Sequence, residues 1–412
     1  MTDYEEHINS PLLQSVIPEP FYNFMSLCGE KTAEKLEDVW KKNSEKNINK
    51  FLDKHGAVGE ELISFAKNKA VIIVGGGPSF KKNRDVLKKL YEFNTKFDIQ
   101  DQPFVIMSSN HMLKPLLDMG IFPHLTVVLD GGNHFRDQFI NLNTDLKCVM
   151  IANIAADHKM LKRWDRDGHR MSFFMGESNN SRDFYREKTG KDPDKLCTFT
   201  GGNVMNTALM LSLRFLHSRF IITLGNDLSF PLISDYDERK KSFYSDGDYS
   251  TQDGRKDEAQ HGIAWMAYEH GGKSAFDQNA QLINYNKVLT SKQLLIYKVW
   301  IEMHIAKWAE QGEFPFRYYN CSEGGICGVV AKKHAVEDLE DPANWGLMDD
   351  IAPKCWFTKP LINAAKDFLE IRKSCLTQMG TNINAGGVIE LLPRMGGASY
   401  TDLAGQSRII RA

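Results

Sequence analysis

Five short clusters of this chain are rich in glycine, asparagine, aspartate, serine or histidine, residue types that can bind phosphate or accept a proton. Most of them directly follow apolar runs of strand length. Each cluster alone is also compatible with ordinary turn chemistry. In a doubly wound α/β protein, however, the ligand lies beyond the carboxyl ends of the strands. We therefore expect one shared pocket, built from the clusters at residues 75–79, 108–111, 130–134, 200–204 and 225–227.

The first cluster is Gly75, Gly76, Gly77, Pro78 and Ser79, which follows an apolar, β-branched run. Glycines allow a tight turn and a close approach of backbone N–H groups to a ligand, and proline suits the first turn of a helix. A helix N-terminus attracts phosphate through its N–H groups and its dipole. The dinucleotide fingerprint and the P-loop both need another spacing. The cluster therefore predicts either an anion site for an unspecified nucleotide or a plain strand-to-helix turn.

Two aspartates and one histidine are the candidates for proton transfer. Asp130 and Asp227 follow predicted strands, where they could bind sugar hydroxyls, hold a metal ion, act as a general base, or cap a helix or turn. His261 precedes Gly262 at the end of a long polar segment. The pKa of imidazole suits proton transfer, although a loop histidine is often only solvated. The sequence leaves these roles open.

The other candidates for nucleotide or sugar binding lie in three clusters, two of which contain glycine. One follows a predicted strand, one precedes a long apolar segment of helical character, and one follows Arg317, Tyr318 and Tyr319. Glycine permits close approach of the backbone, and the polar side chains could bind a base or a sugar. A glycine-rich strand end is the alternative for the last cluster. These candidates are Asn110, Gly201, Gly202, Asn203, Ser322, Glu323, Gly324 and Gly325.

The composition is that of an ordinary globular protein, with 412 residues, 42% apolar residues and a net charge of −2. This charge gives no basic field for nucleic acid. Seven scattered cysteines without CxxC spacing favour free thiols in a reducing compartment over a zinc site or a disulfide framework. The polar start does not resemble a signal peptide, and no apolar run approaches the roughly 20 residues of a membrane span. We therefore expect a cytoplasmic protein without a membrane span.

Short apolar runs alternate with helix-length segments, which predicts an α/β protein with a Rossmann-like, mainly parallel sheet and flanking helices. The predicted strands are 71–74, 104–107, 125–129, 148–151, 171–174, 220–224 and 316–319. Helical texture is expected at 274–311 and 356–379, and a long polar loop at 235–257. We expect three regions: a helical N-terminal region 1–68, a nucleotide-binding catalytic domain 69–330, and a helical C-terminal region 331–412 with a glycine-rich tail.

Four of the motifs, taken in order, resemble a known family. They are the clusters at residues 75–79, 200–204, 224–228 and 320–325. Their order is similar to that of the family joining motility accessory factor glycosyltransferases to 6-hydroxymethylpterin diphosphokinases of the MptE-like type. The resemblance covers residues 69–330. It implies a Rossmann-like nucleotide-binding core similar to that of bacterial sialyltransferases.

The resemblance implies first a glycosyltransferase that moves a nonulosonic (sialic-acid-like) sugar from a CMP donor to a hydroxyl of a glycan or protein acceptor, without a cofactor. His261 or Asp227 would accept the proton, and the segment 232–261 would close over the pocket. The alternative is a 6-hydroxymethylpterin diphosphokinase, in which Asp130 and Asp227 would hold Mg²⁺ across the phosphates of ATP. A non-catalytic structural or assembly protein with the same fold is the second alternative. A homo-oligomer is left open.

Overall fold

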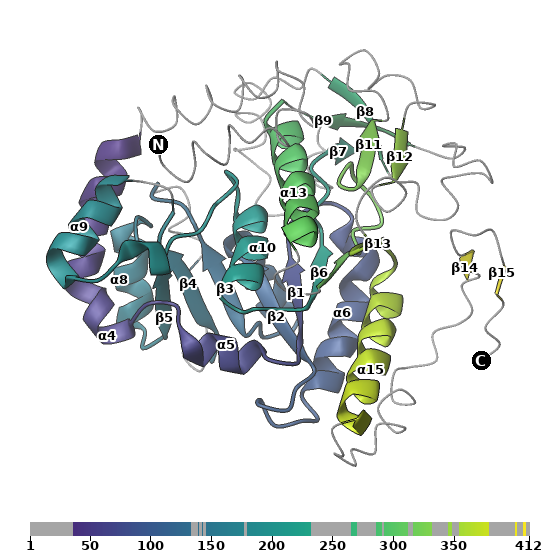
Figure 1. Cartoon of the computed structure of the whole chain (residues 1–412), viewed down its shortest axis with the longest axis horizontal. Helices are drawn as coiled ribbons and strands as arrows, with labels where there is room; N and C mark the ends of the chain where they lie inside the picture. The colour runs from purple at the N-terminus through teal and green to yellow at the C-terminus, as the bar shows by residue number, and fades with distance from the viewer. Residues whose placement is uncertain are drawn as a thin grey trace. The chain divides into compact units, whose positions relative to one another are not determined.

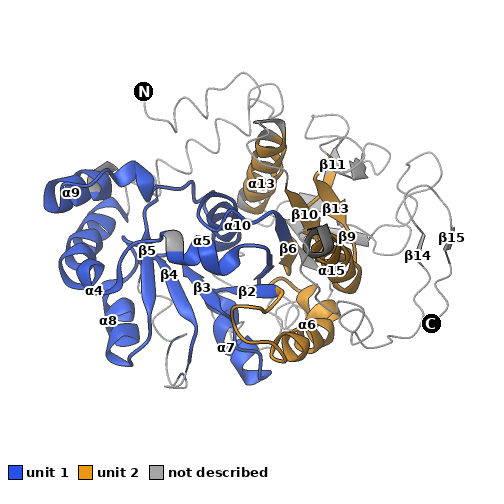
Figure 2. Cartoon of the chain, turned by 60° about the horizontal axis from the view of Figure 1, so that its bottom comes forward, with its two compact units in different colours: residues 1–75, 104–221 blue, residues 76–103, 222–412 orange. Residues whose placement is uncertain are grey.

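The computed structural model describes residues 36–132, 139, 142, 146–176, 179–231, 265–269, 286–290, 292–311, 316–331, 345–347, 354–378, 400–401 and 407–408. Internal contacts divide the chain into two compact units (Figure 2). Unit 1 comprises residues 1–75 and 104–221, and unit 2 comprises residues 76–103 and 222–412. The units interleave along the chain. The three consecutive regions expected from the sequence stay a prediction.

The fold contains an eight-stranded, all-parallel sheet with the strand order β13-β10-β6-β1-β2-β3-β4-β5 (Figure 1). All residues of β1, β2, β3, β5 and β6 are buried, as expected for parallel strands covered on both faces. The Rossmann-like α/β prediction is therefore confirmed. The strands are β1 (Ala70–Val74), β2 (Phe104–Ser109), β3 (Leu125–Val128), β4 (Val149–Asn153), β5 (Met171–Phe174), β6 (Phe220–Leu224), β10 (Arg317–Asn320) and β13 (Trp356–Thr358).

Unit 1 contains strands β1 to β5 and the helices that cover them. Helix α7 packs against β2 and β3, whereas α10 packs against β1, β2 and β3 and lies in front of the sheet in Figure 1. Helix α7 connects β2 to β3, whereas α10 lies on the connection that runs back across the sheet from β5 to β6. Because crossovers between parallel strands are right-handed, connections that run in opposite directions place their helices on opposite faces. The helices are α5 (Glu60–Ala66), α7 (Asn110–Asp118), α8 (His158–Arg166), α9 (Asn179–Thr189) and α10 (Val204–Arg214).

A continuous helical segment precedes the sheet in unit 1. Residues 36–47 are α-helical and continue through the π-turn η1 (Ile48–Leu52) into α4 (Asp53–His55). Phe51 is fully buried. The helical character expected for the N-terminal region is thus confirmed for residues 36–55 and for α5.

Unit 2 contains α6 (Phe80–Asn94), α13 (Lys292–Gln311) and α15 (Leu361–Gln378). Strand β10 pairs in parallel with β13, and α15 packs against α6. Small antiparallel sheets accompany them. They pair β7 (Phe230–Pro231) with β9 (Asn286–Thr290) and β9 with β8 (Trp265–Glu269), β11 (Val329–Ala331) with β12 (Trp345–Leu347), and β14 (Tyr400–Thr401) with β15 (Ser407–Arg408).

Two of the expected helical stretches contain strands instead, and both predictions are wrong at those residues. The stretch 274–311 includes strand β9, whose neighbours β7 and β8 are distant in sequence. The stretch 356–379 begins with β13, and its helix starts only at Leu361. Pro360 disfavours helical backbone at the residue before it, which separates β13 from α15. Aromatic residues such as Trp356 and Phe357 also fit a strand well.

Candidate functional site

Within unit 2, the side-chain carboxylate of Asp227 lies at the N-terminus of helix α6. The backbone N–H of Ser79 donates to Asp227 Oδ2 at 2.7 Å, and the Ser79 hydroxyl donates to Oδ1. Asp227 is only 2% exposed. A carboxylate at a helix N-terminus interacts favourably with the helix dipole. The anion position expected at the turn before α6 is therefore filled by a side chain of the protein itself.

Gly77 brings this turn into contact with the residues that follow β6. Its N–H donates to the carbonyl oxygen of Gly225 at 2.9 Å. A Cβ atom at Gly77 would lie 2.5 Å from Asp227 Oδ2 and 2.6 Å from the Gly225 oxygen, so a side chain does not fit. Two oxygen atoms beside this position also repel a phosphate. The glycine is explained by packing inside unit 2.

The loop that carries Ser322 and Gly325 packs against the same segment. The Ser322 hydroxyl accepts a hydrogen bond from the Asn226 N–H at 3.1 Å, and the Ile326 N–H donates to the Asp227 carbonyl at 2.8 Å. Gly325 has a φ of +76°, and a Cβ atom there would collide with the backbone of Asp227. Ser322 is fully buried. Its hydroxyl therefore holds the loop in place instead of facing solvent.

Glu323 is placed differently from the buried residues around it. It is half-buried, whereas its neighbour Gly324 is buried, and its φ is +55°, a conformation that non-glycine residues adopt rarely. The Lys82 ammonium group donates to its carbonyl oxygen. Nearby, the Asn83 side chain donates to the carbonyl of Cys321 at 2.9 Å. Helix α6 thus fixes the backbone of this loop and leaves the Glu323 side chain partly accessible.

The turn before α10 in unit 1 is stabilised by its own polar groups. Gly201 and Gly202 have φ values of 57° and 74°, which favour glycine. Asn203 is the N-cap residue, and its Oδ1 accepts from the Asn206 N–H at 2.9 Å. The Asn206 side chain donates in return to the Gly201 carbonyl at 3.1 Å. These contacts involve amide and backbone groups and no carboxylate.

Two polar atoms near this turn have no hydrogen-bond partner in the part of the chain that the structure describes. They are the side-chain nitrogen of Asn203 and the hydroxyl of Thr198, a residue 3% exposed. Leaving a buried donor unpaired costs about 1–3 kcal/mol, so such groups in proteins usually bind water or a ligand. Helix α10 ends at Arg214, shortly before β6 begins at Phe220, so its first turn lies at the opposite, carboxyl edge of the strands.

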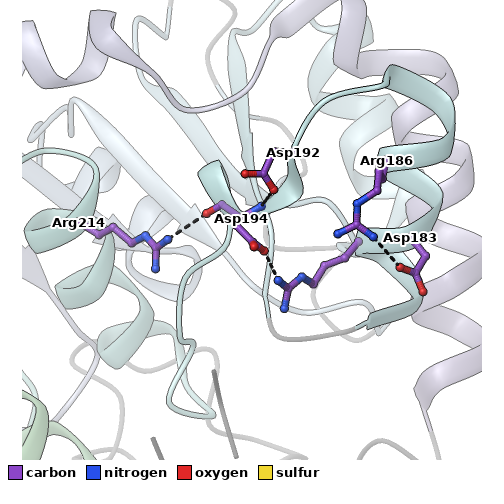
Figure 3. A network of polar contacts seen from close by, with 6 residues as sticks. Asp183, Arg186, Asp192, Asp194 and Arg214 are labelled. Atoms are coloured by element: carbon purple, nitrogen blue, oxygen red, sulfur yellow. Dashed lines mark hydrogen bonds and ion pairs between the residues drawn. The ribbon is translucent and has the colours of Figure 1, made fainter. Parts of the chain in front are cut away.

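A polar network anchors the segment that leads to this turn (Figure 3). Arg214, in the last turn of α10, donates to the Asp194 carbonyl at 2.9 Å. The Asp194 carboxylate pairs with Arg182 of α9, and its N–H donates to the Asp192 carboxylate at 3.1 Å. Exposed ion pairs contribute little to stability one by one. Together these contacts tie η3 (Pro193–Lys195) to α9 and α10.

Asn110 and Asp130 lie after β2 and β3 in unit 1. Asn110 is the first residue of α7 and is 1% exposed. Ser109 before it is buried, and its hydroxyl has no hydrogen-bond partner among the described residues. Asp130 is half-buried, and its carbonyl accepts from the Asp157 N–H at 3.1 Å. The two expected ligand-binding residues thus follow neighbouring strands of one unit.

The helical segment 36–47 covers the chain beyond β3 and β4, which the sequence did not indicate. The Asn43 side chain donates to the carbonyls of Gly131 and Ala155 at 3.0 and 3.2 Å. The Asn47 side chain donates to those of Ile154 and Ala156 at 2.8 and 2.9 Å. The only available signal was the spacing of two asparagines one helical turn apart. This part of the carboxyl edge is closed by protein.

The buried histidine His124 precedes β3, at the amino edge of the strands. Its Nδ1 accepts from the Ile106 N–H at 3.0 Å. Burial and, to a lesser extent, the nearby Lys69 ammonium group lower the pKa of His124 to about 4, against the raising effect of the hydrogen bond with Ile106. His124 is therefore neutral at physiological pH. It serves the fold at the edge opposite to the expected ligand site.

The predicted site residues that the structure describes occur in both units. In unit 2, Ser79, Asp227, Ser322 and Gly325 belong to one contact cluster. In unit 1 the corresponding residues lie at the start of α7, after β3 and at the start of α10. His261 and the lid expected at residues 232–261 lie outside the described residues. Within the described part, no three His, Cys, Asp or Glu side chains gather as a metal site.

Part of this sequence matches the model of a known protein family. Residues 42–232 match the family model described as "6-hydroxymethylpterin diphosphokinase MptE-like". This stretch is less than half of the 412-residue chain, and we call it the MptE-like segment after the model that it matches. The family resemblance stated from the sequence motifs is therefore confirmed. The MptE-like segment includes the turns before α6 and α10, and it ends just after β7.

A solved structure described as the MAf glycosyltransferase from Magnetospirillum magneticum AMB-1 is similar to this chain, with 15% identity and a TM-score of 0.45. The similarity covers 82% of this chain and 42% of that protein, so the chain spans less than half of its length. A search of curated proteins gave no match. None of the described helices is long and apolar enough to cross a membrane.

Proposed function

We propose that this chain is a transferase that uses a nucleotide-activated donor, and specifically a glycosyltransferase that moves a nonulosonic acid from CMP to an acceptor hydroxyl. The MptE-like segment and the parallel sheet support a nucleotide-dependent transferase. The choice of the glycosyltransferase branch comes from the geometry around Asp227. The cytoplasmic location, the glycan or protein acceptor and self-association stay predictions.

The contact between Asp227 and Ser79 carries this choice. A diphosphokinase that uses Asp130 and Asp227 as Mg²⁺ ligands needs the second carboxylate to face the phosphates of ATP. Both oxygens of Asp227 instead accept hydrogen bonds from Ser79, and the residue is buried. Glycosyl transfer from CMP needs no such carboxylate pair, because helix N-termini and cations can stabilise the departing phosphate. We therefore assign Asp227 to positioning the turn before α6.

The turn before α10 is our candidate for binding the phosphate or the carboxylate of the donor. Gly201 and Gly202 carry no side chain that could block an approaching anion. The side-chain nitrogen of Asn203 and the hydroxyl of Thr198 supply donors that have no partner among the described residues. The dipole of the eleven-residue helix α10 adds a favourable field at the same end.

The remaining roles follow from the chemistry of the transfer. Asn110, Asp130 and Glu323 would bind the nucleotide and the sugar through their amide and carboxylate groups. His261 would accept the proton of the acceptor hydroxyl as its oxygen attacks the anomeric carbon and the bond to CMP breaks. Water would compete with the acceptor, so closure of segment 232–261 would favour transfer over hydrolysis.

The diphosphokinase remains the alternative, because the matched family model is described by that activity. It would require ATP, a pterin alcohol and Mg²⁺. A non-catalytic protein with the same fold is the second alternative, and it would bind none of these ligands.

Calorimetric titration with CMP, CDP, UDP, GDP and ATP, each with and without Mg²⁺, separates the three functions. We expect CMP to bind most tightly, with an affinity that does not depend on Mg²⁺. Mg²⁺-dependent diphosphate transfer from ATP to 6-hydroxymethylpterin would overturn the proposal. Absence of binding by all five nucleotides to the folded chain would favour the non-catalytic alternative.

A further inference from the structure

Helix α13 carries an ion pair that is buried within unit 2. The Lys298 ammonium group lies 2.8 and 2.7 Å from the two carboxylate oxygens of Glu302, one helical turn further on. Their side chains are 6% and 7% exposed. Among the described residues, no other ion pair has both partners so deeply buried. Replacing a buried pair by apolar residues is often neutral or stabilising, so stability alone does not explain it.

The Glu302 carboxylate has a third partner outside its own helix. Its Oε1 accepts a hydrogen bond from the backbone N–H of Gly328 at 2.8 Å. Burial raises the pKa of Glu302, while Lys298 and the Gly328 hydrogen bond act in the opposite direction. Gly328 has a φ of +86°, and a Cβ atom there would lie 3.0 Å from the Trp356 ring. The backbone at Gly328 is therefore held at one position.

Gly328 ends the loop that begins after Asn320 and carries Ser322 and Glu323. The Asn320 side chain donates to the Cys327 carbonyl at 2.7 Å, which closes the loop on itself. Helix α6 and the residues after β6 hold its first half through the contacts described above. The second half of the loop is held by the hydrogen bond from the Gly328 N–H to the Glu302 carboxylate of α13. The loop is thus held between α6 and α13.

We propose that Glu302 is a positioning residue that fixes the loop 321–328 for nucleotide binding, with Lys298 as its counter-ion. This inference rests on the proposed function, because it takes the loop to contact the nucleotide. Glu302 binds the Gly328 N–H and thereby fixes the backbone of the loop. The position of this backbone determines where the half-buried Glu323 side chain lies. The ammonium group of Lys298 contacts both carboxylate oxygens of Glu302 and so offsets the cost of burying their charge.

Two double variants test the proposal, because they differ only in the acceptor offered to Gly328. Lys298→Met/Glu302→Gln removes both charges and keeps a side-chain oxygen for the Gly328 N–H. Lys298→Met/Glu302→Met removes both charges and that oxygen. Methionine adapts to irregular core space, which favours folding of both variants. CMP affinity is measured by calorimetry, and amide hydrogen exchange is followed over residues 321–328.

We expect the glutamine variant to bind CMP within about twofold of the wild type, and the methionine variant to bind about tenfold more weakly at a similar melting temperature. Exchange of residues 321–328 should accelerate at least tenfold in the methionine variant only. Equal affinity in the two variants, or losses that follow melting temperature, would overturn the proposal. If CMP does not bind the wild type, the proposed function fails, and the positioning role is judged from hydrogen exchange alone. Unchanged exchange of residues 321–328 in the methionine variant would then refute positioning.

If the methionine variant does not fold, the exchange rate of the Gly328 amide in the wild type is used instead. Slow exchange of this amide supports positioning, and exchange as fast as that of exposed amides refutes it.

Discussion

The turn before α6 packs against Asp227, whereas the turn before α10 is capped by its own Asn203. Gly77 is required because no Cβ atom fits, while Gly201 and Gly202 are required by positive φ angles. One helix N-terminus is thus neutralised by a carboxylate, and the other retains donors without partners among the described residues. Glycine-rich turns of similar composition therefore differ in what they offer an anion. The deciding factor is a residue distant in sequence.

Acid should lower the stability of unit 1 more than that of unit 2. This is the largest effect that we expect. The described histidines with a lowered pKa are His124, His158 and His169, and all three belong to unit 1. His124 stays neutral in the folded state while the unfolded chain takes up a proton below its ordinary pKa of 6.5, so stability falls as the pH drops towards about 4. At about 1.4 kcal/mol per pKa unit, this amounts to about 3 kcal/mol for His124.

Urea unfolding at pH 7 and pH 4.5 measures this loss, and hydrogen exchange assigns it to a unit. The control is His124→Asn, which keeps an acceptor for the Ile106 N–H but does not titrate. The wild type should lose more stability than the variant, and most of the difference should appear in unit 1. Equal losses in both proteins would contradict the assignment of His124.

Asn203→Asp should weaken CMP binding about 100-fold, equivalent to about 2.7 kcal/mol. Aspartate is as good an N-cap as asparagine, so the free energy of unfolding should change by less than about 0.5 kcal/mol. The loss comes from removing a donor and adding a negative charge beside the anion. Calorimetry measures it, and Asn203→Ser, which keeps a cap without the charge, should give an intermediate loss. Unchanged CMP affinity in Asn203→Asp would show that the anion does not bind at the turn before α10.

Asp227→Asn should act on stability instead of on binding. It replaces a charged acceptor of two Ser79 hydrogen bonds by an amide, and we expect a loss of about 2 kcal/mol in the free energy of unfolding. CMP affinity of the folded variant should stay within about threefold. A large loss of affinity or turnover with unchanged stability would instead make Asp227 a ligand or a catalytic base, and the two turns would no longer differ as described.

Gly202→Ala should have the smallest effect, about 1 kcal/mol of stability, because alanine is strained at its φ of 74°. Gly168→Ala is the matched control in the same unit, since Gly168 has a φ of +83° and open space around it. Both variants should lose similar stability in chemical unfolding. Only Gly202→Ala should also weaken CMP binding, by a few-fold, and an equal effect of both on affinity would contradict a role of Gly202 at the ligand.

The sequence predicted the parallel sheet well because its strands are short, continuous apolar runs, and the bounds expected for β5 and β6 are those observed. It missed β9 and β13, which are short and depend on partners far along the chain. It singled out both Asp227 and Ser79, but not the contact between them. These residues are 148 positions apart, and such a contact leaves no local pattern. The same holds for Glu302, which lies in an otherwise ordinary helix.

The asparagines of the first helix bind main-chain carbonyls up to 112 residues further along the chain. Such contacts cannot form until the loops after β3 and β4 have their final shape, so this helix should dock late in folding. Main-chain acceptors are present whatever residue occupies the position. The attachment at Ile154, Ala155 and Ala156 therefore does not depend on their side chains, although all three are buried. Gly131, which is packed against Trp40, cannot accept a side chain. Mutational tolerance at this edge should follow steric room and not hydrogen bonding.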